Sequence, residues 1–84
     1  MYTFVFTKLT QKLWSKLDNT VQTRIVEKLK YLKTVENINL YLKVIKGSQE
    51  ATHRARVGDY RIILKREGNT FYMIDIDKRK DVYK

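Results

Sequence analysis

The chain has 84 residues, a length that suits a single domain with a small core. Hydrophobic residues make up 43% and charged residues 32%, which is typical of a folded globular chain and excludes an intrinsically disordered one. The formal net charge of +9 predicts a polyanionic partner: nucleic acid first, an acidic protein second and a membrane surface third.

The residue types that are missing exclude several kinds of chemistry. The chain has no cysteine, so there is no disulfide framework, and its one histidine and scattered carboxylates do not suggest a metal site. We therefore expect no metal and no cofactor. The first residues lack the pattern of a secretory signal, and no apolar run approaches the ~18 residues needed to span a bilayer. We expect residues 1–84 to form one cytoplasmic domain that makes no contact with membranes.

In the first part of the chain the apolar residues follow the spacing of a strand and then the spacing of two helices. Residues 2–7 place an aromatic side chain at every second position, which predicts a first strand with one apolar face. Residues 7–17 carry leucines and Trp14 at helical spacing, which predicts an amphipathic helix. Capping residue types at 18–20 precede a second helix, whose apolar stripe is Val21, Ile25, Leu29, Leu32 and Val35. The short connection predicts an antiparallel helical hairpin.

Two features of this part have a second interpretation. Trp14 would serve as a base-stacking platform if it were exposed, but an aromatic residue at helical spacing is more often part of a core. Residues 38–42 fit either a short helical turn or an extended link, and residues 46–48 resemble a loop.

The centre of the chain predicts a β-hairpin with a defined register. Two β-patterned runs, 53–57 and 60–65, flank a Gly-Asp pair, and glycine supplies the positive φ of a two-residue primed turn. This turn places Arg56 directly opposite Arg61. One face of the hairpin then carries His53, Ala55, Val57, Tyr60, Ile62 and Leu64, and the other carries Arg54, Arg56, Arg61 and Lys65. The first face suits a core, and the second is positively charged.

The arginines of the charged face reduce the stability of the fold. Two arginines directly opposite each other destabilise a sheet by ~0.2–1 kcal/mol. Such a cost is tolerated where an anionic partner binds later, so three arginines beside a tight turn favour an anion-binding surface. The alternative is a solvated face on which the arginine stems lie flat over apolar neighbours.

The last hairpin has two possible registers. A three-residue loop at 67–69 places Tyr72 and Ile74 on the core side, whereas a two-residue loop places Phe71 and Met73 there. We predict the three-residue loop, because Asn69 tolerates the left-handed conformation. Asp75 would then lie across from Arg61. The final strand covers about 70–76, and a basic tail with one aromatic residue follows.

The predicted fold is α+β with the order β-α-α-β-β-β, in which a helical hairpin packs on one face of a mainly antiparallel, four-stranded sheet. Three blocks then resemble, in order and spacing, those of the RelE/ParE toxin superfamily: Leu-Lys-Val-Ile-Lys-Gly-Ser at 42–48, Arg-Ala-Arg-Val-Gly-Asp-Tyr-Arg at 54–61 and Lys-Arg-Lys-Asp-Val-Tyr at 78–83. The resemblance covers the whole chain and implies a RelE-like fold. It also implies a cytosolic type II toxin that an acidic, RelB-like antitoxin neutralises.

In the RelE branch the implied activity is cleavage of messenger RNA in the 30S A site of the ribosome. Attack by the RNA's own 2′-hydroxyl needs a base, cations around the phosphorane and a proton for the leaving oxygen. By resemblance, Arg61 and Arg79 stabilise the phosphate and Tyr83 takes the near-terminal aromatic role. Lys78 is the better proton carrier because neighbouring cations disfavour its charged form. The expected RNA-binding residues are Arg54, Arg56, Lys65 and Lys80.

Two departures from the family pattern leave the general base open. Lys78 stands where many members have histidine, and Thr52 stands where some have a basic strand residue. His53 is a less favoured replacement, because its position in the strand predicts the core side. Two other functions remain possible: a ParE-like inhibitor of DNA gyrase that cleaves nothing, and a non-catalytic nucleic-acid binding module.

Overall fold

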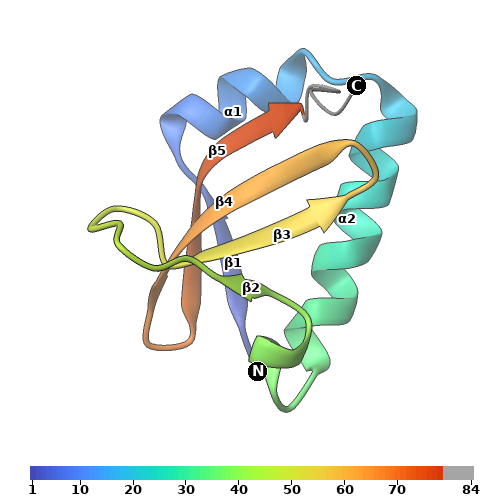
Figure 1. The fold of residues 1–84 in the computed structure, drawn as a ribbon. Helices are drawn as coiled ribbons and strands as arrows, with labels where there is room; N and C mark the ends of the chain where they lie inside the picture. The colour runs from blue at the N-terminus through green and yellow to red at the C-terminus, as the bar shows by residue number, and fades with distance from the viewer. Residues whose placement is uncertain (79–84) are drawn as a thin grey trace, which may run out of the picture.

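The computed structural model describes residues 1–78, which form an α+β fold (Figure 1). The strands in these residues are β1 (Thr3–Phe6), β2 (Lys43–Val44), β3 (His53–Val57), β4 (Tyr60–Glu67) and β5 (Thr70–Lys78). The helices are α1 (Lys8–Ser15), α2 (Asn19–Thr34) and the 3₁₀ turn η1 (Ile38–Leu40). One sheet has the order β1-β5-β4-β3-β2, in which β1 pairs with β5 in parallel and the other pairs are antiparallel. The predicted class and the mainly antiparallel sheet are confirmed.

The sheet has one strand more than the sequence predicts. β2 pairs with the start of β3 at one edge of the sheet, where Lys43 lies opposite Arg54 and Val44 opposite His53. A strand of two residues is too short for alternation to reveal it. The neighbouring η1 shows that the helical-turn alternative holds for residues 38–40.

The second helix begins where its capping residues predict. The side chain of Asp18 accepts a hydrogen bond from the backbone N–H of Val21 at 3.0 Å, which starts α2. Ile25, Leu29 and Leu32 of the predicted stripe are buried. Trp14 is half-buried and its ring meets that of Phe6 edge-on at 5.1 Å, as expected for a core residue.

The core lies between the helices and one face of the sheet. Figure 1 shows α1 and α2 behind the sheet, while the near face of β3, β4 and β5 carries no helix. The buried cluster consists of Ile25, Leu29, Leu32, Ile38, Leu42, Ala55, Val57, Ile62, Leu64, Phe71 and Met73. Ala55, Ile62 and Leu64 are fully buried, so the apolar face of the central hairpin points to the core as predicted.

The β3–β4 hairpin has the predicted register. Arg56 lies opposite Arg61 and Ala55 opposite Ile62, across the two-residue turn Gly58-Asp59. Gly58 has a φ of 58°, which is the left-handed region that the first central residue of a type II′ turn needs.

The predicted register of the β4–β5 hairpin is wrong. Glu67 pairs with Thr70 across a two-residue turn, in which Gly68 rather than Asn69 has a positive φ, of 63°. Phe71 and Met73 therefore face the core and are fully buried. A register shift between Ile63 and Leu64 leaves Ile74 as an extra residue on β5.

Beyond this bulge the even-numbered residues of β5, rather than the odd-numbered ones, face the core. Ile76 is buried opposite Ile62, and Asp77 rather than Asp75 lies opposite Arg61. The reason is that the shorter turn moves the register by one residue and the bulge moves it by one more. The two shifts together restore the alternation that the sequence pattern suggests for the end of the strand.

Two threonines tie α1 to β5 at the bulge. The hydroxyls of Thr7 and Thr10 both donate to the carbonyl oxygen of Met73, each at 2.9 Å. Thr7 is also the N-cap of α1, and the side chain of Thr10 accepts from the Thr7 backbone N–H. Thr10 is fully buried, so its bond to the Met73 carbonyl forms out of contact with water.

Candidate nucleic-acid interface

Five cations share the sheet face that carries no helix. They are Lys43 on β2, Arg54 and Arg56 on β3, and Arg61 and Lys65 on β4, and together we call them the basic face. Directly opposed residues stand on the same side of a sheet, and so do alternate residues along a strand. The structure thus brings together the four hairpin cations that the sequence placed on this surface. Lys43 was missed because its short strand was missed.

The basic face is arranged in rows that cross the sheet. The first row is Arg56, Arg61 and Asp77; the second is Lys43, Arg54, Ile63 and Asp75; the third is Lys65, Tyr72 and Val5. Positive charge therefore lies over β2, β3 and β4, and the two aspartates lie over β5. An anionic strand is attracted to the first part and repelled from the second.

Arg61 is the most constrained of these cations. It stands between Arg56 and Asp77, and its Nε is shielded from solvent without a hydrogen-bond partner among residues 1–78. A shielded donor without a partner costs folding free energy. An anion bound at this point would remove both that cost and the repulsion from Arg56.

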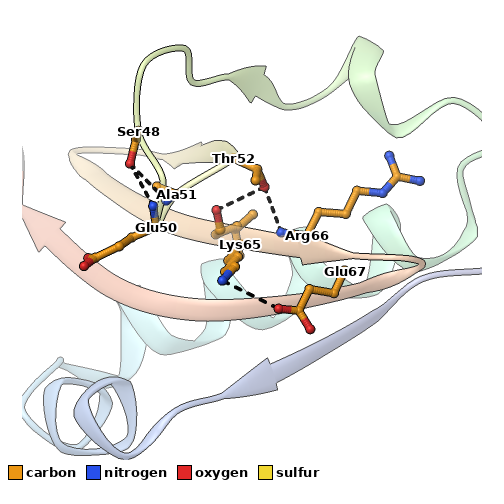
Figure 2. A network of polar contacts seen from close by, with 8 residues as sticks. Ser48, Glu50, Ala51, Thr52, Lys65, Arg66 and Glu67 are labelled. Atoms are coloured by element: carbon orange, nitrogen blue, oxygen red, sulfur yellow. Dashed lines mark hydrogen bonds and ion pairs between the residues drawn. The ribbon is translucent and has the colours of Figure 1, made fainter.

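Within residues 1–78 the arginines of the basic face have no ion-pair partner. The ion pair found there joins Lys65 Nζ to Glu67 Oε2 at 3.6 Å and is shown in Figure 2. Both side chains are exposed, 43% for Lys65 and 59% for Glu67, so the pair is weak and easily exchanged. The charge of the face is therefore available to a ligand.

Of the predicted catalytic and RNA-binding residues at and beyond the end of β5, the structure describes only Lys78. Lys78 lies opposite Tyr60, which shares the core-facing side of β4 with Ile62 and Leu64. Lys78 is exposed, and its Cα–Cβ direction starts on the helix-covered side, away from Arg61. The other predicted residues of this region, Arg79, Lys80 and Tyr83, lie outside the described residues.

His53 is on the core side, as its position in the strand predicts. It is buried, its Nε2 lies 3.0 Å from Asn39 Oδ1 and its Nδ1 lies 2.9 Å from Thr52 Oγ1. Its ring also meets Phe71 edge-on at 5.3 Å. Burial, and secondly the charge of Arg66, lower the pKa of His53. Both ring nitrogens are engaged, so His53 has a structural role in joining η1 to the sheet.

Thr52 also serves the fold. Its hydroxyl oxygen accepts from the backbone N–H of Arg66 at 2.7 Å and lies 3.4 Å from the carbonyl of Leu64, as Figure 2 shows. The residue therefore binds the start of β3 to β4. Its short side chain contributes no charge to the basic face.

Arg66, which the sequence analysis did not single out, lies on the other side of the sheet. Its guanidinium carbon stands 5.4 Å from the ring centroid of Tyr2 and 5.5 Å from that of Phe71, and its Nε donates to the carbonyl of Gly68 at 2.7 Å. These contacts hold the cation over the edge of the core. Arg66 is thus a structural arginine, despite the basic sequence around it.

The arrangement suits a phosphodiester chain. Guanidinium groups bind phosphate through two parallel hydrogen bonds and remain charged at any physiological pH, so Arg54, Arg56 and Arg61 can surround a phosphate and stabilise negative charge that develops on it. The same permanence makes them poor proton acceptors. The described part of the face therefore offers charge stabilisation but no evident general base.

The chain is thus a small α+β protein in which one face of the sheet is covered by helices and the other is bare and cationic. The fold is that of RelE toxins, as the sequence resemblance implied. It is similar to the isolated E. coli RelE toxin, with a TM-score of 0.78, 18% identity and coverage of 99% of this chain and 89% of that one.

Two toxin–antitoxin complexes also contain similar chains. The E. coli RelBE complex matches with a TM-score of 0.75, 19% identity and coverage of 95% and 99%. The RelB–RelE complex from Methanococcus jannaschii matches with a TM-score of 0.72, 28% identity and coverage of 94% of each chain. No model of a known protein family and no curated protein matches the sequence.

None of the helices within residues 1–78 combines the length and the apolar character needed to cross a bilayer. The same residues hold no group of three or more histidine, aspartate or glutamate side chains in a metal-binding arrangement.

Proposed function

We propose that this chain is the toxin of a type II toxin–antitoxin system and acts as a ribosome-dependent endoribonuclease. It would cut messenger RNA in the 30S A site, through attack of the RNA's 2′-hydroxyl on the adjacent phosphodiester, and so inhibit translation. The observation that carries the proposal is the group Arg54, Arg56 and Arg61 on a bare sheet face, where the shielded Nε of Arg61 has no hydrogen-bond partner among residues 1–78. The similar RelE structures support the toxin role.

Each residue has a stated task in this proposal. Arg61 and Arg79 stabilise the phosphorane, and Tyr83 stacks on a base or hydrogen-bonds the phosphate. Lys78 transfers a proton, although it starts from the other side of β5, so its task is the first to test. The residues that hold the RNA are Arg54, Arg56, Lys65 and Lys80. Guanidinium groups supply the charge that a metal ion provides in other nucleases, so the reaction is metal-independent and uses no cofactor.

The ribosome supplies what the chain lacks. Attack by a 2′-hydroxyl needs the attacking oxygen, the phosphorus and the leaving oxygen in line, and holding that geometry removes a large part of the barrier. A chain with few proton-transfer groups gains most from a substrate that the A site already orients. Cutting is therefore expected on translated message rather than on free RNA.

The antitoxin in this proposal is an acidic, RelB-like protein. The net charge of +9 calls for an acidic partner, and two of the similar structures are complexes named for RelB and RelE. An acidic chain that covers the basic face would exclude RNA from it. In this proposal the protein acts in the cytoplasm, together with the ribosome and the antitoxin.

The test is translation of one message in a cell-free extract, followed by primer extension and by a gyrase supercoiling assay. We expect cuts within codons for the unsubstituted chain, also with EDTA-treated protein, and none for Arg61→Ala or Arg79→Ala. Lys30→Ala is the matched control, because Lys30 is an exposed cation on α2, on the other side of the sheet.

The other outcomes identify the alternatives. Intact message with inhibited supercoiling indicates a ParE-like gyrase inhibitor. Intact message, active gyrase and RNA binding that weakens with salt indicate a binding module without catalysis.

A further inference from the structure

We propose that Tyr72 is a stacking platform for one base of a single-stranded RNA whose phosphates lie on the basic face. The inference rests on the proposed function, because it takes RNA as the ligand of that same face. It adds a residue that sets where the RNA lies, at a position that the sequence pattern had assigned to the core.

Tyr72 stands on the bare face beside a cation. In the third row of the face it lies directly between Lys65 on β4 and Val5 on β1. Directly opposed residues have Cβ atoms only ~4.5–5.5 Å apart, so the side chains of Tyr72 and Lys65 start side by side on this face. Tyr72 is half-buried and Val5 is 36% exposed, which leaves an aromatic and apolar area open next to the positive charge.

The ring of Tyr72 is not used by the fold in the way that other aromatic rings are. Among residues 1–78 the aromatic pairs and the Arg66 stack involve Tyr2, Phe4, Phe6, Trp14, Tyr31, Tyr41, His53 and Phe71. In this part of the chain only Tyr60 and Tyr72 take no part, and Tyr60 lies on the core-facing side of β4. Tyr72 is therefore the unpaired aromatic residue of the bare face.

Lys65 links the Tyr72 ring to the cations that would bind the RNA phosphates. Its ion pair with Glu67 is solvent-exposed, so a phosphate can replace the carboxylate at little cost. Lys65 is four residues from Arg61 along β4, which corresponds to ~13 Å. A base on Tyr72 thus belongs to a nucleotide away from the phosphate at Arg61, so Tyr72 positions the strand and does not touch the reacting atoms.

The combination selects RNA over an acidic protein as the ligand. Cations alone attract either, but an aromatic face beside them adds an interaction that a base makes and a glutamate side chain does not. Stacking is also tolerant of sequence, so Tyr72 favours the presence of a base rather than a particular codon.

The test measures binding rather than cleavage. Fluorescence anisotropy at low salt compares a short single-stranded RNA with an abasic ribose-phosphate strand of the same length, on the full chain and on Tyr72→Val. We expect the full chain to bind the RNA about 5- to 150-fold more tightly than the abasic strand, and Tyr72→Val to lose that preference. Tyr72→Phe keeps the ring and keeps the preference.

Further variants control for folding and for surface tyrosines in general. Tyr72→Thr is a second ring-free variant with high β-propensity, and thermal unfolding confirms that each variant is folded. Tyr31→Ala removes a tyrosine that is 52% exposed on α2, and it should leave the preference unchanged.

Several results would overturn the inference: equal binding of both strands by the full chain, a preference that survives in the folded ring-free variants, or no binding of RNA. If Tyr72→Val weakens the binding of a glutamate-rich peptide as much as it weakens the binding of RNA, the surface is assigned to an acidic protein instead. Failure of the proposed function is a different result: the message stays intact in the cell-free translation assay, although the preference for RNA over the abasic strand depends on Tyr72.

Discussion

Arg61→Met should stabilise the protein while it removes the activity. Methionine keeps an unbranched, apolar stem but has neither the charge nor the Nε donor of arginine. The substitution ends the direct opposition of Arg56 and Arg61, which costs ~0.2–1 kcal/mol, but it also ends the opposition of Arg61 and Asp77, which contributes a similar amount, so these two effects nearly cancel. The remaining effect is the removal of the shielded Nε that lacks a partner among residues 1–78. An unsatisfied buried donor costs ~1–3 kcal/mol, and less here because the residue is only half-buried.

We therefore expect the free energy of unfolding to rise by about 1 kcal/mol, measured by urea denaturation, with a Tm higher by about 4–8 °C. Cleavage of message should fall by about 10²–10³-fold, as for the loss of one transition-state donor. Arg56→Met is the matched control, because it removes the same like-charge pair but no shielded Nε. Its gain in stability should be the smaller one.

The opposite result would refute the argument. If Arg61→Met loses more than about 1 kcal/mol of stability, the arginine stem serves the fold and the repulsion is already relieved, which is the solvated-face alternative. If stability rises but cutting continues at its full rate, the cations of this face do not stabilise the transition state.

Four other predictions follow from single contacts. The lowered pKa of His53 means that the unfolded chain binds a proton more readily below about pH 6.5, so the free energy of unfolding should decrease as pH falls from 7 to 5, and less steeply in His53→Asn. Gly58→Ala should cost about 1–2 kcal/mol in urea denaturation, because φ is 58° there while a new Cβ meets Arg24 only at 3.7 Å. Thr10→Val should cost about 1–2 kcal/mol by the same measurement, because the Met73 carbonyl loses a buried donor. Lys65→Gln should reduce the slope of log affinity for single-stranded RNA against log salt by about 0.7, whereas Lys30→Gln should not.

The sequence predicts most of the fold that positions the basic face. The Gly-Asp turn is flanked by residues that alternate strictly, so one turn type fixes every partner from His53 to Leu64. The start of α2 follows from capping chemistry at Asp18, which is local and therefore readable in sequence. These are the regions where turn chemistry and hydrophobic pattern agree.

The second hairpin shows where such reasoning fails. Around residues 70–76 apolar side chains occupy both odd and even positions, so the pattern fits two registers equally. The structure uses both, Phe71 and Met73 before the bulge and Ile76 after it. A β-bulge has no sequence signal of its own, and the Met73 carbonyl that meets Thr7 and Thr10 comes from a distant segment.

The candidate site was predictable to the extent that it depends on alternation. The positions of Arg54, Arg56, Arg61 and Lys65 on one face required only the hairpin register. Lys43 required a two-residue strand, and the exposure of Tyr72 required the register that the sequence left ambiguous. Long-range pairing decided both.

The extra residue at Ile74 also determines how β5 can vary in length. Leu64 pairs with Met73 and the next residue of β4, Ile63, pairs with Asp75, so Ile74 is the one position of β5 that the ladder with β4 skips. Deleting Ile74 would put Asp75 directly after Met73 and keep every pair and every side as they are, whereas deleting a paired residue such as Ile76 would move Asp77 to the core side opposite Ile62. A related chain that is one residue shorter at this point should therefore show unbroken alternation along β5, with its charges and its apolar side chains on the same faces as here.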